Sequence, residues 1–268
     1  MHTIRPLNDL HNEFKEYEVP VMADEKNMVL TLSGDIYDRK YLMRWVHSLS
    51  PRFKAILIVL GNHDYWGGSV EQVIKKHKQY IIEHDLKNVY VLDCESVMID
   101  NILYYGGTMW TNFNNMDPMA MMAYNSSRDC KFIRHKNYRL RWSAKDAIVE
   151  HNKFKLGLQA TAAAYPTIPM VVMSHHGPTH LSIDPNFEAG TSGAYVADMS
   201  NLIMDHPNIR LWHHGHTHSF GDYVFGPYDQ RTICNPLGYN ACKHLKVARL
   251  VKEFDPNFLI SSSTLELT

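Results

Sequence analysis

Histidine side chains gather in short polar segments that directly follow apolar runs of the chain. Of the 17 histidines, those in such segments are His11, His63, His175, His176, His213, His214, His216 and His218. Neutral imidazole is the commonest metal ligand in proteins. The distribution of histidine along the chain therefore indicates a metal site before any motif is considered.

The spacing of the polar residues would direct several candidate metal-ligand side chains toward one site. Asp9 and His11 are two residues apart, as are His216 and His218, and in extended backbone such pairs point to the same side. The remaining candidate ligands stand at the ends of apolar runs and are Asp35, Asn62 and His175. A mixed set of oxygen and nitrogen donors suits Mn, Fe, Zn, Co or Ni better than Ca or Mg, which prefer oxygen alone.

Buried strands that end in polar loops would have to position these residues. The apolar runs predicted to be strands are residues 28–33, 54–60, 169–174 and 209–212. Helices are predicted over 38–49, 69–83, 143–164 and 194–204, and further strands near 223–225, 232–234 and 246–251. This alternation is typical of an α/β protein, here a two-sheet sandwich flanked by helices. Ligands of α/β sheets bind at the carboxyl ends of the strands, where each polar segment lies.

Composition and length describe an ordinary globular chain. With 268 residues, 45% of them hydrophobic and 21% charged, the chain can form one sizeable core, and we expect a single domain over residues 1–268. The formal net charge of −1 creates no field that would attract a polyanion, so nucleic acid is not favoured as a partner. No apolar run approaches about 18 residues and no signal-peptide pattern opens the chain, so we expect no membrane partner and a cytoplasmic location.

Five motifs succeed one another between residues 9 and 218, which is most of the chain. They are Asp9-x-His11, Gly34-Asp35-x-x-Asp38-Arg39, Gly61-Asn62-His63-Asp64, His175-His176 and Gly215-His216-x-His218. Each alone is a weak signal, whereas five in order at predicted strand ends are specific. In this order they resemble the motifs of calcineurin-like metallophosphoesterases. The resemblance implies a hydrolase of phosphate esters that uses two divalent metal ions, on a four-layer α/β/β/α fold.

The resemblance also implies a role for each matching residue. One ion would be held by Asp9, His11, Asp35 and His218, and the other by Asn62, His175, His216 and the shared Asp35. A hydroxide bridging the two ions would attack phosphorus in line while the ions hold the phosphoryl oxygens. His63 would donate a proton to the leaving group, Asp38 would hold His63 in orientation, and Arg39 would contact a phosphate oxygen.

Two parts of the pattern leave alternatives open. The first strand contains Pro6, which cannot donate a hydrogen bond to a neighbouring strand, so either that strand is short or Pro6 faces no partner. His175 is assigned as the ligand because it comes first after its strand, and His176 is the alternative. His213 and His214 are placed outside the ligand set, because the last motif already supplies two histidines.

An excursion at about residues 106–141 lies between the motifs and is rich in asparagine, arginine and aromatic residues. Because loops on a rigid scaffold often set specificity, we expect Asn125 and Arg128 to contact the substrate, with His176 as a further contact. A catalytically silent metal-binding scaffold is the alternative to an enzyme, and a nuclease or a protein phosphatase is the alternative within the enzyme class. The sequence does not distinguish monoesters from diesters, and it leaves the oligomeric state open.

Overall fold

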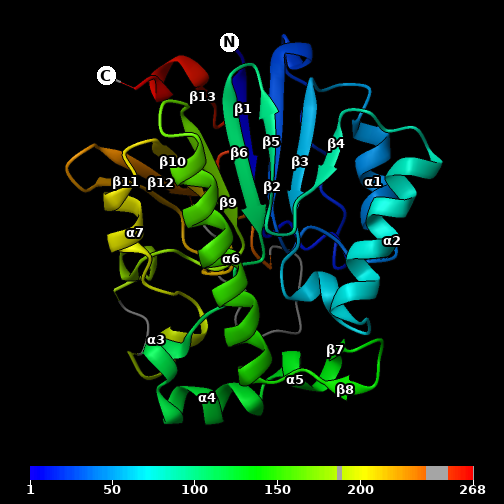
Figure 1. The fold of residues 1–268 in the computed structure, drawn as a ribbon. Coiled ribbons are helices and arrows are strands. Elements are labelled where there is room, and N and C mark those ends of the chain that lie inside the picture. Colours follow the sequence, from blue (N-terminus) through cyan, green and yellow to red (C-terminus); the bar gives the residue numbers. More distant parts are fainter. Residues whose placement is uncertain (186–188, 240–252, 268) are drawn as a thin grey trace.

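Two mixed β-sheets form the centre of the molecule in the computed structural model, which describes residues 1–185, 189–239 and 253–267 (Figure 1). Within these ranges the first sheet has five strands in the order β13-β1-β2-β3-β4. Their bounds are β1 Thr3–Leu7, β2 Met28–Ser33, β3 Ala55–Val59, β4 Val89–Val91 and β13 Ile260–Ser261. Strands β1 to β4 run parallel and β13 pairs antiparallel with β1. The carboxyl ends of β1 to β4 therefore meet at one edge.

The second sheet has six strands in the described part of the chain, in the order β11-β12-β10-β9-β6-β5. Their bounds are β5 Glu95–Ile99, β6 Ile102–Gly107, β9 Met170–Ser174, β10 Ile209–His213, β11 Gly221–Phe225 and β12 Gln230–Cys234. The inner strands β6, β9, β10 and β12 are parallel, whereas β5 and β11 pair antiparallel at the two edges. This sheet also gathers the carboxyl ends of its parallel strands on one side.

Helices cover the outer face of each sheet and complete the four layers α/β/β/α (Figure 1). Helices α1 Leu42–Leu49 and α2 Val70–Glu83 pack on the first sheet. Helices α6 Ala144–Ala164 and α7 Ser200–Asp205 pack on the second. The expected α/β sandwich flanked by helices is confirmed. No helix among the described residues is both long and apolar enough to cross a membrane.

Alternation of side chains along the strands divides the core into layers. Leu30 of β2 joins a buried cluster with α1 and α2, whereas its neighbour Val29 joins the cluster between the two sheets. In β9, Val171 faces the first sheet and Val172 packs with Phe154 of α6. Both faces of each central strand are thus buried, which explains why these strands appear in the sequence as continuous apolar runs.

Four predicted strands and two predicted helices, α2 and α6, match the structure closely, whereas β4, β5 and β6 were not predicted. Strands β2, β3, β9 and β10 match their predicted ranges to within one residue at each end. The helix expected from Asp38 begins later, because the Asp38 carbonyl accepts a hydrogen bond from Tyr41 N and forms a turn first. The helix expected from residue 194 is shorter, because Ala197 N donates to Gly177 O and joins that stretch to the loop after β9. The strand expected over residues 246–251 lies outside the described residues.

Pro6 lies in β1 at a position where its missing N–H has no strand partner. Its carbonyl accepts a hydrogen bond from Asn235 Nδ2 at 3.0 Å, and the nitrogen and oxygen of one strand residue point to the same side. On that side of β1, strand β13 pairs only with Thr3 and Ile4. The described part of β13 therefore does not reach Pro6. The first strand is therefore full length, and it pairs with β2 as far as Leu7.

Short elements at one end of the sheets make up the excursion, which in the structure covers residues 113–142. Its elements are α3 Phe113–Met116, α4 Pro118–Asn125, α5 Arg128–Phe132, β7 Arg134–His135 and β8 Leu140–Arg141. They lie together along the bottom of Figure 1, with β7 and β8 paired as a small antiparallel hairpin. The excursion begins later than expected, because Gly106 and Gly107 complete strand β6.

A buried ion pair holds the long connection between β1 and β2. Arg5 is fully buried, and its Nη1 donates to Glu25 Oε1 at 3.3 Å. Arg52 donates to both oxygens of the same carboxylate, at 2.8 and 2.6 Å. The hydrogen bonds from Arg52 hold the pKa of Glu25 below its usual value, although burial acts in the opposite direction. This network fixes the chain between the two strands that end near Asp9 and Asp35.

Replacement of the buried carboxylate should lower the stability of the fold. We expect Glu25→Gln to reduce the free energy of unfolding at pH 7 by about 3 kcal/mol, because it leaves Arg5 buried without its counter-charge. The lowered pKa means that the wild-type carboxylate stabilises the fold above its unfolded-state pKa and loses this contribution as pH falls through the folded-state pKa. Urea unfolding at pH 7 and at acid pH measures both effects.

Glu95→Gln is the matched control, because Glu95 pairs with Lys78 on the surface at 2.6 Å. Its effect should stay within about 1 kcal/mol, as is usual for an exposed ion pair. Equal effects of the two substitutions would contradict a special role for the buried network.

Candidate metal centre

The residues expected to bind metal lie at the edge where both sheets gather the carboxyl ends of their parallel strands. They come after β1 (Asp9, His11), β2 (Asp35), β3 (Asn62), β9 (His175) and β10 (His216, His218). Backbone hydrogen bonds join neighbouring strand ends: His11 N donates to Asp35 O at 3.0 Å, and Gly215 N donates to His175 O at 2.9 Å. Residues that are distant in sequence thus meet in one place.

Asp9, His11 and His218 form the first group of donors. His218 Nε2 lies 3.2 Å from Asp9 Oδ1 and 3.1 Å from His11 Nε2. Asp9 and His11 are buried, whereas the His218 side chain is 22% exposed. The first group can therefore be reached from outside along the His218 side.

Asp35, His175 and His216 form the second group, together with the side chain of Asn62. His175 Nε2 lies 3.0 Å from Asn62 Oδ1, 3.1 Å from His216 Nδ1 and 3.4 Å from Asp35 Oδ2. The four donors therefore surround one point next to His175 Nε2.

The Asp35 carboxylate stands between the two groups. Its Oδ2 lies 3.4 Å from His175 Nε2 and 3.8 Å from His11 Nε2. Burial acts to raise the pKa of this carboxyl, but the charges of His175 and His63 hold it well below its usual value. A carboxylate that stays ionised and faces both groups is suited to serve two cations at once.

The donor sets fit divalent metal ions. Ligands bound at about 2.1 Å and at right angles to each other lie about 3 Å apart, which is close to the spacing found in both groups. Each group mixes oxygen with imidazole nitrogen, as transition-metal sites do. The residues present could therefore hold such ions without rearrangement of the strand ends.

The structure distinguishes the two adjacent histidines. His175 directs Nε2 into the second group, whereas His176 Nδ1 faces Thr108 O at 3.3 Å. The His176 ring packs against His216 and Trp110, with ring centroids 4.3 and 5.4 Å apart. His176 is 1% exposed, which does not fit the substrate contact expected for it. His176 instead packs against the His216 ring and helps to hold that ring in position.

His63 lies beside the first group of donors. Its backbone N donates to Asp35 Oδ1 at 2.9 Å, and its ring stacks on Trp66 with centroids 3.7 Å apart. Nε2 is 3.3 Å from Tyr239 Oη, and Nδ1 is 3.6 Å from Glu13 Oε1. Burial acts to lower the pKa of His63, but the carboxylates of Asp35 and Glu13 raise it above its usual value. The ring is thus held in place, and its pKa lies above that of a free imidazole.

The carboxylate that contacts His63 is Glu13 instead of the expected Asp38. Asp38 accepts a hydrogen bond from Lys40 N at 2.8 Å within its own turn. Glu13 Oε1 lies 2.9 Å from His11 Nδ1, and Glu13, His11 and His63 form a further close group of donors. Burial acts to raise the pKa of Glu13, but hydrogen bonds with the two imidazoles lower it to about 2. The sequence signal for this role was an acidic residue two positions after His11.

Arg39 also differs from its expected role as a phosphate contact. Its Nε donates to Trp66 O at 3.0 Å, and its Nη2 donates to Gly67 O at 2.9 Å. These carbonyls belong to the loop after His63. Arg39 therefore positions that loop, and with it the Trp66 ring on which His63 stacks.

A cavity of about 410 Å³ opens over both groups of donors. Besides the donors, its lining includes Trp66, Tyr124, Ser127, Arg128, Tyr195 and Tyr239. Arg128 is therefore placed where a substrate could reach it. Asn125 is not among the residues that line this cavity, and its Oδ1 accepts a hydrogen bond from Ala144 N at 2.9 Å at the start of α6.

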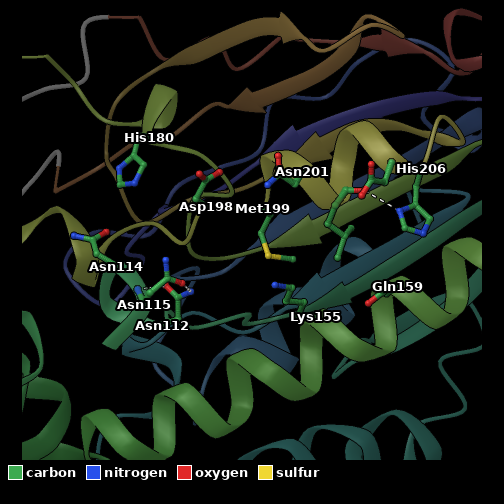
Figure 2. Close-up of a pocket in the computed structure, with 12 residues that line it drawn as sticks. Asn112, Asn114, Asn115, Lys155, Gln159, His180, Asp198, Met199, Asn201 and His206 are labelled. Carbon is green, nitrogen blue, oxygen red and sulfur yellow. Dashed lines mark hydrogen bonds between the residues drawn. The ribbon is translucent and has the colours of Figure 1, made fainter. Parts of the chain in front are cut away.

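A larger cavity, of about 670 Å³, lies apart from the donors, over α6 and α7 (Figure 2). Figure 2 shows Lys155 and Gln159 on one wall and Asn201 and His206 on the other. His206 Nδ1 already bonds to a backbone carbonyl of its own helix, at 2.8 Å. None of the described residues that line this cavity belongs to either group of donors, so size alone does not identify the site.

Comparison with known proteins assigns the chain to a family. A family model of calcineurin-like phosphoesterases matches residues 2–220. The chain belongs to the calcineurin-like phosphoesterase family. An uncharacterized protein of Acanthamoeba polyphaga mimivirus is 24% identical over 267 residues, which is 90% of this chain and 92% of that protein. Hydrolysis of phosphate esters is therefore the general chemistry of this phosphoesterase, and the two groups of donors are its candidate metal ligands.

Solved structures resemble this phosphoesterase over most of its length. Phosphopantetheinyl hydrolase from Mycobacterium tuberculosis superposes with a TM-score of 0.65 at 16% identity, over 88% of this chain and 89% of that one. A dimetal phosphatase from Danio rerio gives a TM-score of 0.48 at 12% identity, over 87% and 86% of the two chains. The first of these likenesses confirms the fold.

Many of the phosphoesterase's expected ligands have a backbone conformation that is rare outside glycine. Positive φ angles occur at Asp9 (49°), His11 (46°), Asp35 (52°), His216 (68°) and His218 (49°). Such conformations cost about 1–3 kcal/mol each and persist only where the surroundings hold them. Other described residues share this conformation, among them Phe113 to Met116 of the excursion, so positive φ alone does not identify the site, although it does occur at five of the seven expected ligands.

The Asp35 carboxylate should be required at both groups of donors. We expect metal-free wild-type protein to bind two Mn²⁺ ions, and Asp35→Asn to weaken binding at both positions by at least about 100-fold, because the amide loses the shared negative charge. Titration calorimetry measures the stoichiometry and both affinities.

Asp38→Asn makes the same chemical change three positions along the chain and should bind like the wild type. An Asp35→Asn protein that binds both ions with wild-type affinity would show that this carboxylate is not shared.

Proposed function

We propose that this phosphoesterase hydrolyses phosphate esters with two divalent metal ions held by the two groups of donors. The observation that carries the proposal is the Asp35 carboxylate, whose Oδ2 faces His11 at 3.8 Å and His175 at 3.4 Å. One ion would be held by Asp9, His11, Asp35 and His218, and the other by Asn62, His175, His216 and Asp35. Membership of the family supports this class of reaction.

The residues around the ions would divide the chemistry between them. When bound, the ions would supply an activated water for in-line attack and would neutralise charge on the phosphoryl oxygens. His63 would donate a proton to the leaving-group oxygen, because the neighbouring carboxylates raise its pKa and its side chain is 13% exposed. Trp66, Glu13 and Tyr239 would keep the His63 ring in the orientation that this transfer needs.

The cavity supports a substrate that combines an anionic group with an organic one. Arg128 contributes a cationic side chain to its lining, and Trp66, Tyr195 and Tyr239 contribute aromatic rings. An aromatic lining can pack against the organic part of a small ester, whichever leaving group it carries. The net charge of −1 and the lack of a basic track in the described lining favour a small ester over nucleic acid.

Paired chromogenic substrates test the proposal. We expect Mn²⁺-loaded protein to hydrolyse p-nitrophenyl phosphate, bis(p-nitrophenyl) phosphate or both, and to stop when a chelator is added. The ratio of the two rates assigns the protein as a monoesterase or a diesterase. A protein that carries its full complement of metal but hydrolyses neither ester would favour a silent metal-binding scaffold.

The effect on kcat of removing the proposed proton donor should depend on the leaving group. We expect His63→Asn to bind both ions normally but to lower kcat for an alkyl phosphate by about 10²- to 10⁴-fold, because a poor leaving group needs a proton. The loss should be smaller for p-nitrophenyl phosphate, whose leaving group is stable as an anion. Steady-state kinetics with both esters measures the difference.

His180→Asn, which replaces an exposed histidine on the other cavity, should leave both rates unchanged. Equal losses of His63→Asn on the two esters, or loss of metal in that variant, would overturn the assignment.

A further inference from the structure

A carboxylate of the excursion reaches one of the expected metal ligands. Asp129 of α5 is 6% exposed, and its Oδ1 accepts hydrogen bonds from Asn62 Nδ2 at 2.9 Å and from Trp66 Nε1 at 2.8 Å. Its Oδ2 accepts a bond from Tyr124 Oη at 3.2 Å, and that hydroxyl accepts one from Trp142 Nε1 at 3.0 Å. A continuous chain of hydrogen bonds therefore runs from the excursion to Asn62.

The bond to Asp129 determines which end of the Asn62 amide faces the donors. Asp129 Oδ1 accepts from Trp66 Nε1 as well as from Asn62 Nδ2, so this oxygen acts as an acceptor, and the Asn62 amide turns Nδ2 toward it and Oδ1 away. Oδ1 then faces His175 Nε2 at 3.0 Å. The opposite orientation would place two acceptors together at Asp129 and would direct an NH₂ group, which is no cation ligand, toward the second group. Asp129 thus selects the orientation of Asn62 that can bind metal.

Other contacts make the excursion a firm support for Asp129. Tyr124 is 6% exposed, and the rings of Trp142 and Trp110 pack with centroids 4.6 Å apart. Gly67 N donates to Phe132 O at 2.9 Å, which joins the end of α5 to the loop after His63. The position of α5 is therefore tied to the same loop that carries Asn62.

We propose that Asp129 is a positioning residue that sets the affinity of the second group for its ion, and that this bond couples the metal centre to the excursion. The inference rests on the two-metal centre of the proposed function. Partners that hydrogen-bond to metal ligands typically change metal affinity by about 10- to 100-fold when they are removed. Because such coupling is reciprocal, an ion held by Asn62 must also stabilise α5.

Titration of metal-free protein with Mn²⁺ tests the first part. We expect Asp129→Ala to weaken one of the two ions by about 10- to 100-fold and to leave the other unchanged. Asp129→Asn should recover most of the affinity, because its amide oxygen can still accept from Asn62 Nδ2. An Asp129→Ala protein that binds both ions with wild-type affinity would refute the inference.

Asp117→Ala is the matched control for loosening of the excursion. Asp117 caps α4 by accepting from Met119 N at 2.7 Å and Ala120 N at 3.2 Å, and neither of these bonds involves Asn62. We expect this variant to destabilise the excursion and to bind both ions normally. If it weakens one ion as much as Asp129→Ala does, the effect of Asp129 is general to the segment and the inference fails.

Hydrogen exchange of the wild type tests the reciprocal part and needs no variant. Saturating Mn²⁺ should slow exchange of the amides in residues 128–133 more than that of α2, which covers the far face of the first sheet. Unchanged exchange in 128–133 on addition of Mn²⁺ would overturn the coupling. Neither measurement involves turnover, so a protein that shows the coupling but hydrolyses no ester would refute the proposed function alone.

Discussion

The close approach of neighbouring strand ends is the constraint on which the site depends. Donor atoms from five strands meet there, and at three of these strand ends the ligands have left-handed backbone conformations, which persist only where the surroundings hold them. The glycines of the motifs also make this close approach possible. A Cβ at Gly61 would collide with Asp35, and one at Gly215 would lie 2.7 Å from Asp9 Oδ2. These positions have no side chain because ligand atoms fill the space.

The same closeness makes the charges of the site depend on one another. Burial acts to lower the pKa of His175, but Asp35 and Asp9 raise it to about 9. Burial, with the neighbouring charges of His176 and His175, lowers the pKa of His216 well below its usual value. Imidazoles that share one small volume therefore differ in their affinity for protons. Because protons and metal ions compete for the same lone pairs, each expected ligand responds to the occupation of its neighbours.

Features set by regular secondary structure could be predicted from the sequence, whereas features set by irregular segments could not. Ligands at strand ends belong to the first kind, since parallel strands bring their carboxyl ends together wherever the loops lead. Glu13 takes the place expected of Asp38 because a turn directs the Asp38 carboxylate to Lys40 N. Asp129 gave no signal, because no motif or periodicity relates it to Asn62 across 67 positions of chain. Such contacts depend on the path of the excursion, which no local pattern encodes.

Pro6 also affects whether two copies of the chain can associate by pairing their strands. A strand at the border of a sheet invites pairing with other chains through its free N–H and C=O groups. Beyond Ile4 the outer side of β1 offers no donor at Pro6, and the Pro6 carbonyl is occupied by Asn235. Leu237 N then covers the carbonyl of Asn8 at 3.3 Å. The strand that delivers Asp9 is thereby protected from intermolecular strand addition, and hence from aggregation through this border.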